Sequence, residues 1–177
     1  MAQKNSDTSY VDAKGRTRWR RNEWLAERFR ELGEFLIIGD YEESHAAVYK
    51  RLSYVISRFP ESVETLHAEF RLKEIPDVGP TIAVIVKEYL ETGTCGKFEE
   101  WAEYHPISVL EMLAVPGLGA KMVRTLFMER GIKSLRELEQ ALDTGQLDNQ
   151  RGLGKKTVAN IRAHIQKLAE EAGKGAG

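Results

Sequence analysis

A short glycine-containing turn that leads at once into an apolar-periodic helix occurs three times in this chain, and it constrains the fold more than any other feature. The copies read IPDVGPTIA (75–83), VPGLGAKMV (115–123) and QRGLGKKTV (150–158). Each copy is followed by apolar residues at helical spacing. The repeat predicts three helix–turn–helix corners, and each corner ends in the N-terminus of a helix.

Helical spacing also dominates the rest of the chain. Leu25, Phe29, Leu32 and Leu36 recur at three- and four-residue intervals, and Asn22 before them is a typical helix N-cap. No segment alternates polar and apolar residues with period two. We therefore predict an all-α fold.

Further helices are predicted over 46–59 and from Pro60 onward. Ser108 to Glu111 and Ser134 to Glu137 both have the spacing of a capping box.

The domain prediction follows from these patterns. We expect a flexible basic arm (1–20), a helical lobe with the first corner (21–105), a region with the second and third corners (106–170), and a flexible tail (171–177).

The charges are segregated along the chain, although 26 basic and 27 acidic residues nearly balance. Residues 14–30 hold seven bases and two acids, whereas residues 31–116 hold sixteen acids and seven bases. Residues 117–136 hold five bases and one acid, and residues 150–167 hold five bases and no acid. Positive charge around two of the three corners favours a polyanionic partner, although runs of charge also occur on ordinary solvated faces.

A reducing compartment is expected, because the single cysteine, Cys95, cannot form an internal disulfide. No stretch is apolar enough to span a membrane, and the first residues have no apolar signal region. We expect a cytoplasmic, nucleoid-associated protein with no membrane partner. The four histidines have no neighbours at metal-ligand spacing, so no metal centre is expected from side chains.

Each corner resembles a phosphate-binding site. Glycine lets another molecule approach bare backbone, and the first helical turn presents unpaired N–H groups with the positive end of the helix dipole. The candidate DNA-binding residues are Gly117, Gly119, Ala120, Lys121 and Arg124 in the second corner, Gly152, Gly154, Lys155, Lys156, Thr157 and Arg162 in the third, and Gly79 and Thr81 in the first.

The first corner differs from the other two. Asp77 stands where they have glycine, and its first helical turn has no lysine. A carboxylate would repel phosphate, so the first corner is predicted to be mainly structural. A purely structural role is the alternative for any single corner.

The turn followed by a helix resembles the helix-hairpin-helix motif of DNA repair and replication proteins. The ordered segments NEWLAERFRELGEFL, AAVYKRLSYVISRFPESVETL, IPDVGPTIAVIVKEYLETG and VLEMLAVPGLGAKMVRTLFMERGIKSLREL, with the third hairpin, resemble the N-terminal region of bacterial family X DNA polymerases over roughly residues 22–168. The resemblance implies a small helical lobe related to the lyase domain of DNA polymerase beta. It also implies hairpins that hold the sugar–phosphate backbone without reading bases.

Catalysis is not expected from the residues present. In the family pattern the Schiff-base lysine follows a helix alanine by two positions, and here Ala83 is followed at that distance by Ile85. The other common lysine position is Thr81, and Lys87 lies about 200° around the helix from Ile85. The chain also has no D-x-D pattern for the metal ions of a polymerase palm.

The resemblance further implies that hairpin carbonyls can hold a monovalent cation, K⁺ or Na⁺. The matching carbonyls are those of Leu113, Val115 and Leu118 in the second hairpin, and of Lys73, Ile75 and Val78 in the first. No other cofactor is expected.

The sequence therefore predicts a non-catalytic, largely sequence-independent binder of duplex, gapped or branched DNA that acts in repair, replication or recombination. Two alternatives stay open. One is a residual abasic-site lyase that uses another lysine. The other is an adaptor whose acidic lobe recruits a nuclease, ligase or polymerase.

Overall fold

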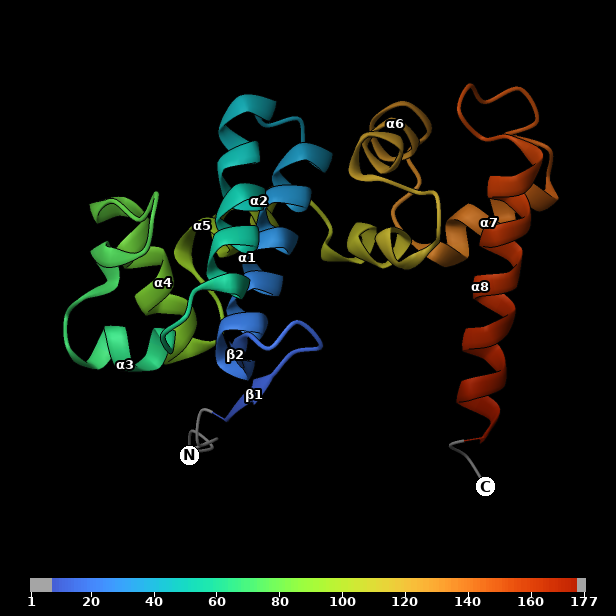
Figure 1. Ribbon diagram of the computed structural model, residues 1–177. Coiled ribbons are helices and arrows are strands. Elements are labelled where there is room, and N and C mark those ends of the chain that lie inside the picture. The colour runs from blue at the N-terminus through green and yellow to red at the C-terminus, as the bar shows by residue number, and fades with distance from the viewer. Residues whose placement is uncertain (1–7, 175–177) are drawn as a thin grey trace. The chain divides into compact units, whose positions relative to one another are not determined.

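The computed structural model of the protein describes residues 8–174, so the expectations for residues 1–7 and 175–177 lie outside the described part. The chain divides into two compact units (Figure 1). Unit 1 comprises Met1–Leu36 and Glu42–Tyr104, and unit 2 comprises Ile37–Tyr41 and His105–Gly177. The last two residues of the helix Arg20–Ile38 and the three residues after it thus group with unit 2, whereas the sequence placed them in the first lobe.

The described part is mostly helical, as predicted. Unit 1 holds β1 (Ser9–Val11), β2 (Thr17–Trp19), α1 (Arg20–Ile38), α2 (Glu43–Arg58), α3 (Val63–Ala68), η1 (Leu72–Glu74), α4 (Pro80–Thr92) and α5 (Gly96–Tyr104). Unit 2 holds η2 (Ile107–Ala114), α6 (Ala120–Arg130), α7 (Leu135–Asp143) and α8 (Lys155–Lys174).

The prediction of a flexible arm is wrong for residues 9–19, which form a two-stranded antiparallel hairpin. Its turn is held by Asp12, whose carboxylate accepts hydrogen bonds from the backbone N–H groups of Lys14 and Arg16. The same carboxylate forms ion pairs with the Arg16 and Arg18 side chains. Sequence periodicity missed the strands because three residues are too few to show alternation.

Asn22 does not cap its own helix, because α1 begins at Arg20. Its side chain is fully buried and accepts a hydrogen bond from the backbone N–H of Val63, the first residue of α3, at 2.9 Å. Its amide also donates to the Glu61 carbonyl at 2.9 Å. Asn22 therefore helps to stabilise the start of a helix that lies forty residues later, where the Ser62 hydroxyl is the local cap.

The core of unit 1 is built by α1, α2 and α4 around aromatic rings. The ring centroid of Phe29 lies 6.2 Å from that of Tyr49 on α2 and 5.8 Å from that of Tyr89 on α4. Phe35 lies 5.1 Å from Phe98 of α5. The apolar spacing predicted for α1 is thus its buried face.

Unit 2 confirms the Ser134 half of one of the two predicted capping boxes, whereas the Glu137 carboxylate bonds to the residue before the cap and not to the cap N–H. The Ser134 hydroxyl accepts from the Glu137 N–H at 3.2 Å, and the Glu137 carboxylate accepts from the N–H of Lys133 at 2.7 Å. Ser108 instead lies inside η2 and donates to the Lys133 carbonyl, so it caps nothing. The predicted flexible tail begins too early, because α8 continues to Lys174 and packs against α7 (Figure 1).

Candidate nucleic-acid interface

The three repeated turns share one backbone conformation. In each, the N–H of the fourth residue donates to the carbonyl of the first at 3.0 to 3.1 Å. The third residue of each turn has a positive φ, +66° at Asp77, +93° at Gly117 and +90° at Gly152. A left-handed third residue with this hydrogen bond is characteristic of a type II turn, which also favours the proline that precedes it in the first two copies.

The first turn keeps this shape although Asp77 replaces glycine, because aspartate tolerates the left-handed region better than most residues. Its carboxylate forms an ion pair with Arg51 of α2 at 3.0 Å. The repulsion that a lone carboxylate would exert on phosphate is therefore partly offset, which the sequence could not show.

The glycine just before the helix of each hairpin, namely Gly79, Gly119 or Gly154, is not required by a left-handed backbone conformation. Gly79 and Gly119 are extended, with φ of −80° and −94°, and a Cβ added at Gly79, Gly119 or Gly154 would meet nothing within 4 Å. Gly79 and Gly119 are the N-cap residues of α4 and α6 and make no side-chain cap hydrogen bond. These positions leave bare backbone beside helix N-termini, where another molecule can approach closely.

The second and third hairpins pack on each other in a reciprocal way. A Cβ at Gly117 would lie 3.8 Å from the Thr157 hydroxyl of α8, and a Cβ at Gly152 would lie 2.2 Å from the Met122 methyl of α6. Met122 and Thr157 are both three residues after the second glycine of their hairpin. Each hairpin thus places its left-handed glycine against the equivalent helix residue of the other, as in an approximate two-fold relation. The Asn160 side chain also donates a 2.8 Å hydrogen bond to the Pro116 carbonyl.

The sequence pattern does not predict this pairing of the hairpins. Aligning the three copies on their glycines places Met122 and Thr157 at equivalent positions, and that equivalence was the available signal. Their contact depends on how the chain returns on itself, which local pattern does not fix.

The lysines and the arginines of these hairpins lie at different positions along their helices. Lys121, Lys155 and Lys156 are exposed at the first turns of α6 and α8. The predicted Arg124 lies further along α6 and pairs with Asp40 at 3.2 Å, and Arg162 lies further along α8 and pairs with Asp143 at 2.8 Å. Because they lie in the first turns of α6 and α8, the lysines are the cations nearest in sequence to the bare turns.

Much of the basic run at 14–30 is neutralised within unit 1. Arg16 and Arg18 pair with Asp12, and Arg21 pairs with Glu64 at 3.0 Å. The remaining pairs join Arg28 to Glu31 and Arg30 to Glu27 and Glu34. The run therefore contributes less positive potential than its composition indicates.

The residues at the positions relevant to lyase chemistry differ in their solvent exposure. Ile85 is 5% exposed in the core of unit 1, whereas Thr81 is exposed at the start of α4. Lys87 is exposed on another face of α4 and lines a groove with Lys73.

No group of three or more histidine, cysteine, aspartate or glutamate side chains with metal-binding geometry occurs within residues 8–174. Backbone carbonyl oxygens can also bind a cation without such side chains. The Val115 carbonyl accepts one hydrogen bond, from Leu118, and a carbonyl oxygen has a second lone pair that can ligate a hard cation. No helix in the described part is long and apolar enough to cross a membrane.

Residues 109–167, which span both reciprocal hairpins, match the family described as SAM-like helix-hairpin-helix tandem. The structure and this match agree on a tandem of helix-hairpin-helix motifs in unit 2. The third copy belongs to this tandem even though Gln150 and Arg151 replace its usual apolar residue and proline.

A longer similarity covers most of the chain. Over 135 residues the protein is 29% identical to DNA polymerase/3'-5' exonuclease PolX of Bacillus subtilis (strain 168). The aligned region is 70% of this chain and 23% of that relative. The predicted resemblance to bacterial family X polymerases is thus confirmed as a distant similarity, restricted to under a quarter of the relative's length.

Proposed function

We propose that unit 2 binds DNA through the backbone phosphates, with its second and third hairpins as a paired grip. The proposal rests on the reciprocal packing of two turns with the same backbone conformation, each of which has an exposed lysine and an uncrowded glycine at a helix N-terminus. Two phosphate-binding turns held in fixed relation suit the regular spacing of phosphates along a strand. The interaction would be largely independent of sequence, since phosphates carry no base information.

The experiment compares duplex, gapped, four-way and single-stranded DNA by fluorescence anisotropy across a salt series. Reversing Lys121, Lys155 and Lys156 to Glu removes three cations from the proposed grip. We expect a large loss of affinity on every DNA and a salt slope smaller by about three.

The matched control carries the same change in net charge at lysines outside the grip, namely Lys14→Glu, Lys50→Glu and Lys87→Glu. This control should retain most of the affinity. Equal losses in both triple variants would reduce the effect to net charge, and unchanged affinity in the first would eliminate the grip.

The proposal extends to a cation and to the absence of catalysis. The carbonyls of Leu113, Val115 and Leu118 would hold K⁺ or Na⁺, whose charge would help to neutralise a phosphate at the second hairpin. We also propose that the chain is not an abasic-site lyase, because Ile85 is buried where the family pattern has its lysine. A covalent adduct trapped by borohydride on abasic DNA would refute this part while leaving the grip intact.

A further inference from the structure

Phe70 is the most exposed large apolar side chain of the described residues, at 96% of its full accessible area. It also has a φ of +59°, a left-handed conformation that costs free energy for a side chain with a Cβ. The Arg71 N–H donates to the Leu66 carbonyl at 2.7 Å, and the Phe70 N–H donates to the His67 carbonyl at 3.1 Å. These two bonds form a Schellman motif at the end of α3, in which Phe70 occupies the position that usually holds glycine.

The turn that carries Phe70 is held firmly. Arg71 pairs with Glu61 at 2.8 Å, with Glu69 at 2.6 Å and with Glu74 at 2.8 Å. These carboxylates raise the pKa of Arg71 above its ordinary value. The ion pairs of Arg71 thus hold the exposed Phe70 ring in place. Burial of the ring does not compensate for the free-energy cost of its left-handed backbone conformation.

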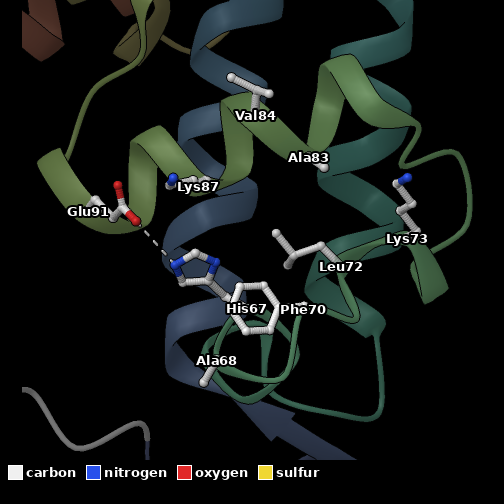
Figure 2. A pocket seen from close by; sticks show the side chains of 9 residues that line it. All are labelled: His67, Ala68, Phe70, Leu72, Lys73, Ala83, Val84, Lys87 and Glu91. Carbon is white, nitrogen blue, oxygen red and sulfur yellow. Dashed lines mark ion pairs between the residues drawn. The ribbon is translucent and has the colours of Figure 1, made fainter.

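A groove of about 490 Å³ lies beside this ring, between α3 and η1 on one side and α4 on the other. Figure 2 shows His67, Phe70 and Leu72 facing the helix that carries Ala83, Lys87 and Glu91. Aliphatic groups of Ala68, Leu72, Ala83 and Val84 line the groove, and Val84 is 54% exposed. The imidazole of His67 contacts the Glu91 carboxylate at 3.5 Å.

Two of the four polar residues that line the groove are lysines. Lys73 and Lys87 are exposed, and within residues 8–174 neither lysine has an ion pair. The nearby carboxylates are already engaged, Glu91 by His67 and Glu61, Glu69 and Glu74 by Arg71. Two unpaired lysines therefore flank an apolar surface within a region, 31–116, that carries sixteen acids and seven bases.

We propose that this groove is a docking site for a short peptide segment of a partner protein, which inserts an apolar side chain against Phe70 and Leu72 and places a carboxylate near Lys73 and Lys87. The aliphatic lining suits such a side chain, an aromatic ring is a common anchor in interaction hot spots, and the two lysines complement a carboxylate. A nucleic acid fits less well, because the acidic surroundings repel a polyanion.

The probe is a library of random 12-residue peptides displayed on phage and selected on the full chain, with counter-selection on Phe70→Ala. We expect enriched sequences that combine a large apolar residue with Asp or Glu. Synthetic versions should bind at least about 10-fold more weakly to Phe70→Ala and to the double variant Lys73→Glu, Lys87→Glu.

Three controls separate docking from other effects. Tyr104→Ala removes another exposed aromatic ring of unit 1, and Lys50→Glu reverses a lysine on α2, and both should leave peptide binding unchanged. The triple glutamate variant of the DNA grip should also bind the peptides normally, so the two proposals fail separately. Thermal melting confirms the fold, and Phe70→Gly should melt higher than the wild type while losing the peptides.

Several outcomes would overturn the proposal. They are a selection that enriches nothing against the Phe70→Ala chain, peptides that bind this variant as tightly as the wild type, or enriched peptides rich in lysine. A loss of single-stranded oligo(dT) binding in Phe70→Ala, without any effect on peptides, would assign the groove to nucleic acid instead.

Discussion

At the scale of single residues, the two glycines of the second and third hairpins have different physical roles. Gly117 and Gly152 occupy the left-handed third position of their turns, so the turn itself requires them. Gly119 is extended and uncrowded, and the added Cβ at Gly154 also meets no atom. The turn conformation therefore requires the first glycine of each pair, whereas the second serves as a helix N-cap or leaves uncrowded backbone beside the helix.

This difference gives a paired prediction. Gly152→Ala should lower the free energy of unfolding by about 1–2 kcal/mol, chiefly because of its positive φ, since the flexible end of Met122 can move aside. Gly119→Ala should cost only about 0.5 kcal/mol, as alanine is a slightly poorer N-cap than glycine.

For DNA affinity the order should reverse: Gly119→Ala should lose more affinity than Gly152→Ala, because its methyl group obstructs the phosphate. Urea denaturation and anisotropy on the same preparations measure both quantities. Gly119→Ala with full DNA affinity would mean that no phosphate approaches this N-terminus.

At the scale of secondary-structure elements, long-range hydrogen bonds join segments that the sequence treats separately. Asn22 on α1 bonds to the start of α3, and Asn160 on α8 bonds to the second hairpin turn. Each contact fixes the end of an element by a residue far along the chain.

We expect Asn22→Ala to lower the free energy of unfolding by about 2–3 kcal/mol, because it leaves the buried Val63 N–H without its acceptor. Urea denaturation followed by circular dichroism measures the loss. Asn149→Ala, at an exposed turn, is the control and should be nearly neutral. A neutral Asn22→Ala would show that water replaces the bond.

The β1–β2 hairpin should be sensitive to acid. Backbone and side-chain hydrogen bonds from Arg16, with further bonds from Lys14 and Arg18, hold the pKa of Asp12 well below its ordinary value. A lowered pKa in the folded state stabilises the hairpin above the ordinary aspartate pKa of about 3.9, and this contribution is lost as the pH falls below it.

Hydrogen exchange of the backbone N–H groups of residues 9–19 should therefore be less protected, relative to α1, at pH 3 than at pH 6. In Asp12→Asn this relative protection should be low at both pH values. An acid-insensitive hairpin in the wild type would contradict the assigned role of Asp12.

At the scale of the whole molecule, charge is distributed unevenly along a chain whose formal net charge is only −1. Unit 2 carries exposed lysines at its paired hairpins, while the surroundings of the groove in unit 1 are acidic. Binding to a polyanion should then be local to unit 2 and should depend on the release of few counterions.

If about four phosphates are neutralised, log K should fall with log salt at a slope of roughly −3 to −4, a loss on the order of 100-fold between 50 and 200 mM salt. Scrambling the base sequence of the same duplex should change affinity little. A slope near zero, or strong preference for one sequence, would contradict binding through phosphates.

The sequence by itself determined the features that depend on local backbone preferences. Glycine and proline spacing specified the three turns, the Ser134 cap and the apolar face of α1 were readable, and the helix-hairpin-helix character followed. These succeed because each conformation is fixed by residues a few positions apart.

Only the tertiary structure decided which groups meet across the chain. It placed the Met122 side chain against Gly152 and the Asn22 side chain at the start of α3. It also paired Asp77 with Arg51 and left Phe70 exposed beside an apolar groove. Such contacts depend on how the chain folds back on itself, and residues of the same type and local pattern can be buried, paired or exposed according to that path.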